Sequence, residues 1–325
     1  AHHNAIAEFA IPAVLGTDAA IADLPLVDQP LQPFATVLDA APTGNPDGID
    51  RIDGLFVDNE NRLIVNAERW YDAAGTARDT TLVLGADELD GSVDGYFEMD
   101  GRVHAGGYMS PVPTEWQLPL DGLVLTGWAS NTSIISRHSI GPSLFTFDPD
   151  EIGADAVTAP RIPTKVHMNF PYADRRWLDP DALDAEPGGA SELWNHLAQA
   201  RYGFIVPGTA TFMAVGSIGG VESGIGYKIT QDNGNLCGGY CPYRHDDTSN
   251  AYWMFDVNEI INADATHEPR PYAFGSWEVA YDDGGRHPII GATFDPTASM
   301  LYVALGNAGQ VSTYDRPPLI VAYAV

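Results

Sequence analysis

The chain has 325 residues and a formal net charge of −28, and only 16 residues are lysine or arginine. A surface this acidic repels nucleic acid and anionic membranes, so we expect neither as a partner. Such a surface is typical of a protein in a salty medium, where dissolved ions screen the repulsion between its carboxylates. Hydrophobic residues make up 45% of the chain, which is enough for one large core.

The N-terminal region is rich in Ala, Pro and Asp and weakly patterned. We expect residues 1–48 to be irregular, with one strand at 35–40. The sequence starts at Ala1 rather than Met, with no signal peptide, and no run approaches the ~20 apolar residues of a membrane span. This pattern indicates a mature exported protein, which we expect to be secreted or periplasmic and monomeric.

Two distant segments share a hairpin pattern. The runs GLFV and RLIV at 54–57 and 62–65 flank a polar turn, which predicts a β-hairpin. Residues 290–305 repeat the frame of glycine, apolar alternation, aspartate, polar turn and Leu-x-Val. The sequence therefore predicts the same hairpin near both ends of a repeating structure.

A second pair of segments is more alike. LFTFDPDEI at 144–152 and YWMFDVNEI at 252–260 each read as an aromatic strand followed by an acidic turn, and we expect each strand to be the outer edge of a sheet. Further strands are predicted at 96–99, 122–128, 203–206, 211–216 and 319–325. One helix is predicted at 190–201, with Ser191 as its N-cap.

Many short strands, 33 glycines and 24 prolines favour an all-β propeller in a single domain, 1–325. Blades of ~40–50 residues would give about seven. We expect the final strand to close the ring by pairing with the N-terminal segment. A pair of β-sandwiches is the alternative.

The only two cysteines, Cys237 and Cys241, are followed by His245 at the same spacing. Two thiolates and an imidazole suit zinc, with His196 or His167 as a fourth ligand. A Cys237–Cys241 disulfide in an exported protein explains the same spacing equally well. Both interpretations make this loop a structural clasp.

Two histidines have notable surroundings. His104 precedes Ala-Gly-Gly, a low-bulk context that suits the floor of a groove, although a hydrogen-bonded turn histidine is the simpler explanation. His138 follows Arg137 in a strand-like run, and alternation places these two side chains on opposite faces.

Residues 165–177 gather basic and phenolic groups in a chain nearly devoid of bases. His167 lies close in sequence to Tyr172, Arg175 and Arg176. Such a cluster in an acidic protein suits an anionic ligand, and a surface pair of arginines answering nearby aspartates is equally consistent with it. The nucleophile elbow, phosphate-binding loop, dinucleotide fingerprint and calcium-loop patterns are absent from the sequence.

Three stretches resemble a bacterial β-propeller group that includes the ulvan lyases, secreted polysaccharide lyases of marine bacteria. They are AGGYMSPVPTEW (105–116), IISRHSIGPSLFTFDPDEIG (134–153) and PIIGATFDPTASMLYVALG (288–306). The cysteine/histidine loop followed by AYWMFD is similar to the metal-bearing segment of that group. Islands of similarity extend over roughly residues 50–325.

This resemblance implies β-elimination at a uronic acid in an anionic, sulfated polysaccharide. A base removes the C5 proton, a cation neutralises the carboxylate, and an acid protonates the leaving oxygen at C4. The residues assigned to this chemistry are His104 and His138 as base and groove contacts, Tyr172, Tyr227 and Tyr243 as candidate acids, and Arg176 as the neutraliser. Further substrate contacts are assigned to Arg137, His167, Arg201 and Arg244, and Arg201 or Arg244 can replace Arg176.

Two other functions fit a propeller. One is a non-catalytic propeller that binds glycan or protein, because a fold does not fix a function. The other is a glycoside hydrolase with two catalytic carboxylates. The products distinguish these possibilities, because only elimination leaves an unsaturated sugar.

Overall fold

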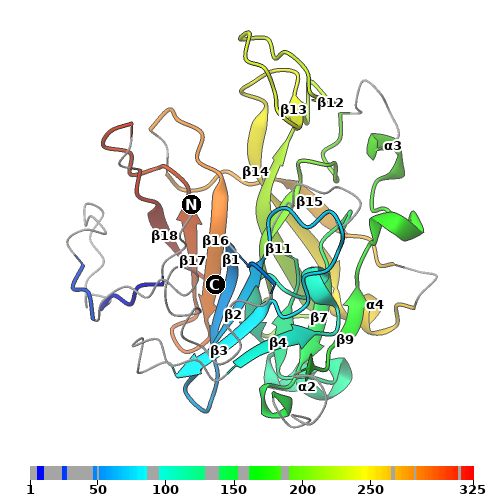
Figure 1. Ribbon diagram of the computed structural model, residues 1–325, viewed down its shortest axis with the longest axis vertical. Coiled ribbons are helices and arrows are strands. Elements are labelled where there is room, and N and C mark those ends of the chain that lie inside the picture. Colours follow the sequence, from blue (N-terminus) through cyan, green and yellow to red (C-terminus); the bar gives the residue numbers. More distant parts are fainter. Residues whose placement is uncertain are drawn as a thin grey trace.

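The computed structural model describes residues 6–10, 24–27, 47–49, 51–85, 95–128, 139–152, 161–183, 190–264, 268–281, 283–313 and 316–325. Within these ranges the chain is mostly β-structure, arranged in four sheets and a two-stranded hairpin (Figure 1). The predicted all-β class is confirmed. The predicted strand at 35–40 lies outside the described residues.

The strands follow one another around the sheets almost in chain order. The first sheet has the order β1 (Arg51–Val57), β2 (Arg62–Glu68), β3 (Thr81–Gly85), β4 (Gly95–Met99) and β8 (Arg161–Ile162). The second sheet has β5 (Met109–Pro111), β6 (Val124–Thr126), β7 (Leu144–Phe147) and β9 (Lys165–Met168). The third sheet has β10 (Gln199–Ile205), β11 (Thr211–Gly219), β14 (Thr248–Asp256) and β15 (Ala273–Ser276). The fourth sheet has β16 (Ile289–Asp295), β17 (Met300–Leu305) and β18 (Leu319–Ala324), and the hairpin has β12 (Ile225–Tyr227) and β13 (Tyr240–Pro242).

Helical segments in the described ranges are short. The α-helices are α2 (Thr114–Leu120), α3 (Pro180–Leu183) and α4 (Val257–Ile261), and three 3₁₀ turns are η3 (Arg102–His104), η5 (Pro149–Glu151) and η6 (Tyr172–Asp174). Of the helices described, none has the length and apolar character needed to cross a membrane.

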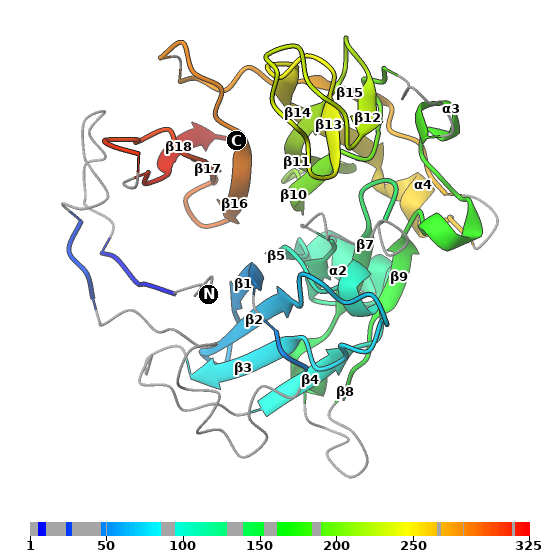
Figure 2. The ribbon, with the colours of Figure 1, turned by 45° about the horizontal axis from the view of Figure 1, so that its top comes forward.

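The four sheets form a propeller-like arrangement with four blades. Figure 2 shows them set around a common centre, with β1, β5, β10 and β16 nearest to it. The strand β5 lies against both β1 and β10, and β10 lies against β16. The prediction of about seven blades is wrong, because the blades are unequal and long. The third sheet alone extends from β10 to β15, with the β12–β13 hairpin inserted between its second and third strands.

A close backbone contact holds the first two blades together. A Cβ atom at Gly54 would lie 2.0 Å from the Gly107 carbonyl oxygen, so only glycine allows β1 to approach this segment. The buried Asn66 amide donates to the same oxygen over 3.1 Å and accepts from the Thr81 hydroxyl over 2.8 Å. Its buried polar atoms are thereby satisfied, and they fix the contact between the blades.

Both predicted hairpins are confirmed. The strands β1 and β2 pair antiparallel, and the Asp58 carboxylate closes their turn by accepting from the backbone N–H groups of Glu60 and Arg62 over 3.0 and 2.8 Å. The strands β16 and β17 pair in the same way, and Asp295 accepts from the Thr297 N–H over 2.8 Å. Local sequence is sufficient here, because aspartate at such a turn caps its backbone donors.

The two similar segments at 144–152 and 252–260 each contain the third strand of a blade. The strand β7 is followed by Asp148, and β14 ends at Asp256, and each of these aspartates caps a short helix. The strand and the acidic turn are confirmed, but the position is not the predicted outer edge. The strands β9 and β15 pair beyond them.

The predicted helix at 190–201 is wrong. The Ser191 hydroxyl accepts from the backbone N–H groups of Leu193 and Trp194, as a helix cap would, but turns follow and β10 begins at Gln199. Tertiary contacts replace the helical hydrogen bonds. The Leu193 carbonyl accepts from the Trp253 indole over 2.7 Å, and the Asn195 amide donates to the Gly219 carbonyl over 2.7 Å.

The predicted pairing of the final strand with the N-terminal segment falls largely on residues outside the described ranges and stays a prediction. Among the described residues β18 pairs with β17 and forms the outer strand of the fourth sheet. Sequential hairpin connections are sufficient to place it there, so the described strands of this blade are contributed by the C-terminal segment alone.

Three of the four innermost strands share a local irregularity. A register shift follows Ile52 in β1, Ala200 in β10 and Ile289 in β16, which leaves one extra residue in each strand. Bulges of this kind redirect a side chain and increase the twist of a strand. In the third blade the extra residue is Arg201, which interacts electrostatically with Asp53, Glu68 and Arg51 of the first blade.

Candidate functional site

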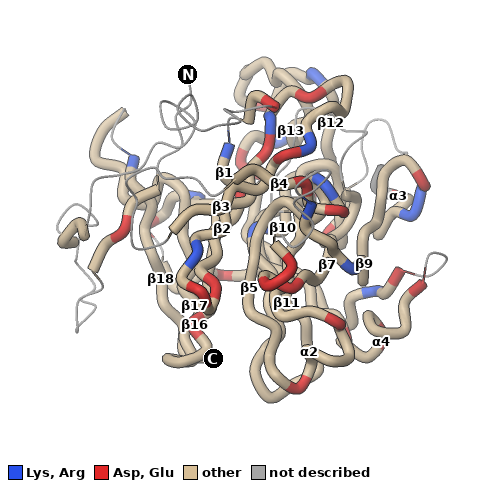
Figure 3. Tube along the Cα trace, turned by 60° about the horizontal axis from the view of Figure 1, so that its bottom comes forward, with Lys and Arg blue, Asp and Glu red and all other residues tan. Residues whose placement is uncertain are grey.

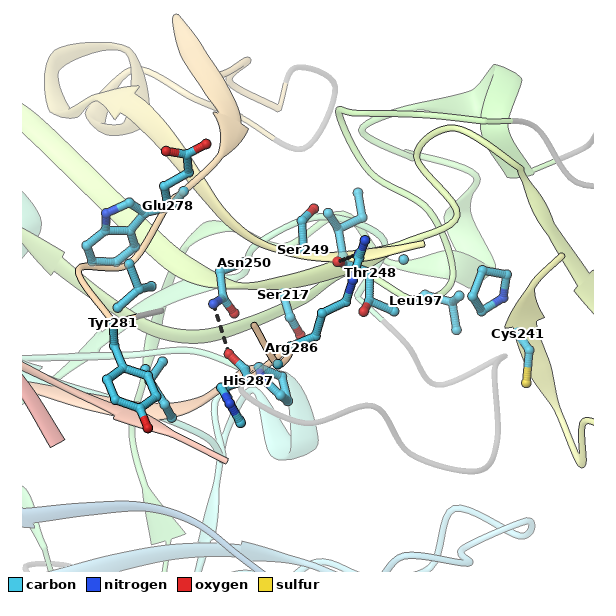
Figure 4. Close-up of a pocket in the computed structure, with 18 of the residues that line it drawn as sticks. Leu197, Ser217, Cys241, Thr248, Ser249, Asn250, Glu278, Tyr281, Arg286 and His287 are labelled. Carbon is cyan, nitrogen blue, oxygen red and sulfur yellow. Dashed lines mark hydrogen bonds between the residues drawn. The ribbon is translucent and has the colours of Figure 1, made fainter. Parts of the chain in front are cut away.

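A groove of about 640 Å³ opens at one end of the third blade (Figure 4). Its floor is polar and includes Ser217 at the end of β11 and Ser249 and Asn250 at the start of β14. One wall is the segment 277–288, which connects the third blade to the fourth. The other wall is the edge of the β12–β13 hairpin, at Tyr240.

The Asn250 side chain fixes the first wall. Its amide nitrogen donates to the His287 carbonyl over 2.9 Å, and its amide oxygen accepts from the Ile289 N–H over 2.8 Å. The side chain thus pairs with the connecting backbone as a neighbouring strand would. This contact holds Arg286 and His287 beside the groove floor, as Figure 4 shows.

A tyrosine, an aspartate and a histidine meet in this wall. The His287 Nε2 atom lies 2.9 Å from one Asp283 carboxylate oxygen, and the Tyr281 hydroxyl lies 3.4 Å from the other. The His287 hydrogen bond, together with the Gly285 N–H, lowers the pKa of Asp283, so this carboxylate is ionised at neutral pH. Desolvation and then the Asp283 charge raise the pKa of Tyr281, so its phenol stays protonated.

The Asp283 contact also orients the imidazole. An ionised carboxylate only accepts, so Nε2 carries the proton that it donates. The remaining nitrogen, Nδ1, lies 3.3 Å from the Gly306 carbonyl oxygen, near the long limit of a hydrogen bond. A carbonyl oxygen only accepts, so with the proton on Nε2 the Nδ1 lone pair makes no hydrogen bond to Gly306 and is the nitrogen that can take up a proton.

Arg286 supplies the positive charge of the groove. Its guanidinium donates to the Thr248 carbonyl oxygen and lies 4.0 Å from the Asp246 carboxylate, while its side chain remains 51% exposed. Asp246 also accepts from Arg244 over the shorter distance of 2.9 Å. Arg286 is therefore only weakly paired and faces a groove where a ligand carboxylate could accept from it.

A disulfide joins Cys237 to Cys241 beside the second wall. This is the second of the two predicted interpretations. A cystine sulfur is not the thiolate that zinc requires, so the residues as paired do not fit a zinc ion. His245 instead has Nδ1 3.0 Å from an Asp232 carboxylate oxygen. Within the described ranges, no cluster of three or more His, Cys, Asp or Glu residues could hold a metal ion.

Two predicted catalytic residues are linked through a shared network outside the groove. The His104 Nδ1 atom lies 2.5 Å from the Asn169 side-chain oxygen. The Glu268 carboxylate accepts from the Asn169 N–H over 3.1 Å and from the Arg176 guanidinium over 2.8 Å. Arg176 therefore neutralises a largely buried carboxylate of the protein itself. The predicted residues His138 and Arg137 lie outside the described residues.

Tyr172, another predicted acid, belongs to a row of rings. Its ring stacks on Trp177 with 5.5 Å between centroids and lies 6.4 Å from His196. His196 in turn packs on Tyr240 at 4.6 Å, and Tyr240 packs on Tyr227 at 5.2 Å. Burial lowers the pKa of His196 to about 4, so this imidazole is neutral at neutral pH.

The basic cluster predicted around residues 165–177 does not form one surface. His167 is buried, and its Nε2 atom lies 2.8 Å from the Thr146 hydroxyl. Desolvation lowers the pKa of His167 to about 4, so neither contact with substrate nor a fourth zinc ligand suits it. Figure 3 shows the basic residues scattered among acidic ones over the described part of the chain.

The other predicted arginines and tyrosines have mainly structural surroundings. Burial lowers the pKa of Arg201 at the ring centre, against the opposing effect of two carboxylates. Arg244 pairs with Glu222 and Asp246, each at 2.9 Å. Tyr243 lies beneath the hairpin, where a Cβ atom at Gly226 would come within 2.9 Å of its hydroxyl.

The groove residues were not among those predicted from the sequence. Tyr281, Asp283, Arg286 and His287 all lie in YDDGGRHP, which has the composition of an ordinary turn. The available signal was the presence of a histidine, an arginine and a tyrosine directly before a predicted strand. Comparison of the chain with protein-family models and with curated proteins finds no match.

Proposed function

We propose that the protein cleaves a uronate-containing acidic polysaccharide by β-elimination in this groove. The observation that supports it most is that an imidazole, a phenol and a weakly paired guanidinium all belong to the lining of one groove. The resemblance of three sequence islands to ulvan lyases supports the same reaction class. The disulfide is compatible with export, where such a polymer would be met.

Each requirement of elimination has a candidate in the groove. Arg286 contacts the uronate carboxylate and stabilises the charge that develops next to it. His287, oriented by Asp283, accepts the C5 proton at Nδ1 once substrate takes the place of the long Gly306 contact. Tyr281 remains a protonated phenol and donates its proton to the leaving oxygen.

The electron balance of the reaction is simple. The C5–H bond breaks and its proton moves to His287, while the electron pair is taken up by the adjacent carboxylate. That pair then forms the C4=C5 double bond as the C4–O4 bond breaks, and O4 takes the proton from Tyr281. The products are one chain with a new reducing end and one with an unsaturated terminal uronate, and no oxidant or reductant is consumed.

The test is the ultraviolet absorbance of ulvan, and of a panel of other uronate polymers, incubated with the protein. We expect absorbance to rise on at least one polymer. His287→Ala and Tyr281→Phe should each lower kcat by about 10²-fold or more, the usual contribution of a general acid or base. His245→Ala and Tyr272→Phe, which change residues outside the groove, serve as matched controls. No rise on any polymer would refute the lyase.

A hydrolase is the second candidate, because Glu278 also lines the groove and Asp283 lies in the same wall. Two carboxylates flanking a sugar could serve as acid and base. New reducing ends without ultraviolet absorbance would identify that reaction. Binding without either product would identify a non-catalytic glycan-binding propeller.

A further inference from the structure

The β12–β13 hairpin places two tyrosine rings next to the groove, one half-buried and one exposed. Tyr227 pairs directly with Tyr240 across the two strands, so both side chains lie on one face of the hairpin. Tyr240 also lines the groove, whereas Tyr227 lies opposite it on the neighbouring strand and is 51% exposed. The aromatic surface of the groove wall therefore continues outward onto the hairpin.

A lysine completes this surface. The Lys228 ammonium lies 5.0 Å from the centre of the Tyr227 ring, and no ion pair is found for it among the described carboxylates. The other lysine, Lys165, has its ammonium 3.2 Å from an Asp121 carboxylate.

The backbone holds this lysine in place. Lys228 has a φ of +54°, a left-handed conformation that costs energy for a residue other than glycine. Its N–H donates to the Gly239 carbonyl over 2.7 Å, and the Cys237 N–H donates to the Ile229 carbonyl over 2.9 Å. The cross-strand hydrogen bonds thus continue beyond the end of β12 at Tyr227. The disulfide between Cys237 and Cys241 constrains the opposite segment, which contains β13.

Tyr240 is supported from below. The buried, neutral imidazole of His196 packs on its ring, and Tyr172 and Trp177 continue the stack behind it. Such packing fixes the angle of Tyr240, and a fixed aromatic face loses little conformational entropy when a ligand stacks on it.

We propose that Tyr240, Tyr227 and Lys228 form a hairpin arm that binds sugar units of an acidic polysaccharide beyond the unit held in the groove. This inference rests on the proposed function for the identity of the polymer. The ring faces contact the apolar faces of successive sugars, and Lys228 pairs with a carboxylate or sulfate on them. The arm makes the protein selective for long anionic chains over short fragments.

The test is affinity electrophoresis through gels containing ulvan or polygalacturonate, at two salt concentrations. Tyr227→Ala and Lys228→Ala should each weaken retention of the protein by about 3- to 10-fold, the range for one aromatic or cation contact. Lys228→Ala should also reduce the salt dependence. The matched controls are Tyr272→Ala, an exposed tyrosine at the opposite end of the third blade, and Lys165→Ala.

The outcomes separate the arm from the chemistry. Retention that depends on Tyr227 and Lys228, without any cleavage, would keep the arm and refute the lyase. Cleavage of a polymer with equal retention of the wild type and both arm variants would keep the lyase and refute the arm. Absence of retention of the wild type on both polymers would also overturn the arm, as would an equal loss in the two control variants.

Discussion

His167 provides a quantitative test of how burial affects stability. Its pKa is lowered from the ordinary 6.5 to about 4, chiefly by desolvation and then by Lys165. Below pH 6.5 the unfolded chain binds a proton at this histidine, whereas the folded chain does not until about pH 4. The unfolded state therefore gains stability as the pH falls, and the free energy of unfolding decreases through this window.

The size of this effect follows from linkage. One pH unit corresponds to about 1.4 kcal/mol for each proton taken up only by the unfolded state. Between about pH 7.5 and about pH 5, a single histidine with these two pKa values lowers the free energy of unfolding by about 2 kcal/mol. His196 is buried with a similar pKa and contributes a loss of the same size.

The perturbation is His167→Gln, which retains an amide donor for the Thr146 hydroxyl. That hydroxyl donates to the Leu120 carbonyl over 2.8 Å, so it accepts from His167. Denaturant unfolding should be measured at both pH values for the variant and the wild type. The variant should lose about 2 kcal/mol less on acidification, because the many carboxylates titrate alike in both proteins.

Thr146→Val is the control for this measurement. It removes a hydrogen-bond partner and keeps the imidazole, so it should lower stability at both pH values by about 1–2 kcal/mol without flattening the pH dependence. The reasoning would be refuted if His167→Gln and the wild type lost the same free energy of unfolding on acidification.

Three other changes test different parts of the structure. Gly216→Ala should destabilise the third blade by more than about 2 kcal/mol in denaturant unfolding, because its Cβ would lie 1.7 Å from the Gln199 carbonyl oxygen, and wild-type stability would contradict this contact. Replacing both Cys237 and Cys241 by serine should cost about 2 kcal/mol, the chain-entropy value for so short a loop, and thiol titration of the wild type should find no free thiol; free thiols with one equivalent of zinc would instead establish the metal site. His104→Ala tests the assignment that the resemblance implies: it should abolish turnover with the fold intact if the chemistry is at His104, whereas retained turnover would leave His287 as the base.

Patterns that are short in sequence were predictable. The turns at Asp58 and Asp295 are closed by aspartate side chains acting over two to four residues, so their hairpins could be read directly. The number of blades could not be predicted from the sequence, because the division of the chain assumed repeats of equal length. The β12–β13 insertion makes the third blade much longer than a typical repeat.

Features that depend on distant partners were not predictable from local patterns. The segment 190–201 has helical spacing, but the Trp253 indole and the Gly219 carbonyl bind its polar groups instead. The groove forms for a similar reason. Asn250 and His287 are 37 residues apart, and only the pairing of the third blade brings them together.

The short strand β8 ties the first two blades to each other. It lies in the chain between β7 and β9 of the second blade, yet it pairs in parallel with β4 of the first. Ile162 is fully buried there, its carbonyl accepts from the Asp100 N–H over 3.1 Å, and the Thr164 hydroxyl accepts from the Gly101 N–H over 3.2 Å.

The pairing of β8 with the first blade affects the order in which the two blades can form during synthesis on the ribosome. The edge of β4 remains open until the chain has been synthesised beyond residue 162, although β4 itself is complete at Met99. An open strand edge is a template for pairing with other chains. The nascent protein therefore carries an exposed edge while most of the second blade is being made, and the two blades reach their final form together rather than in succession.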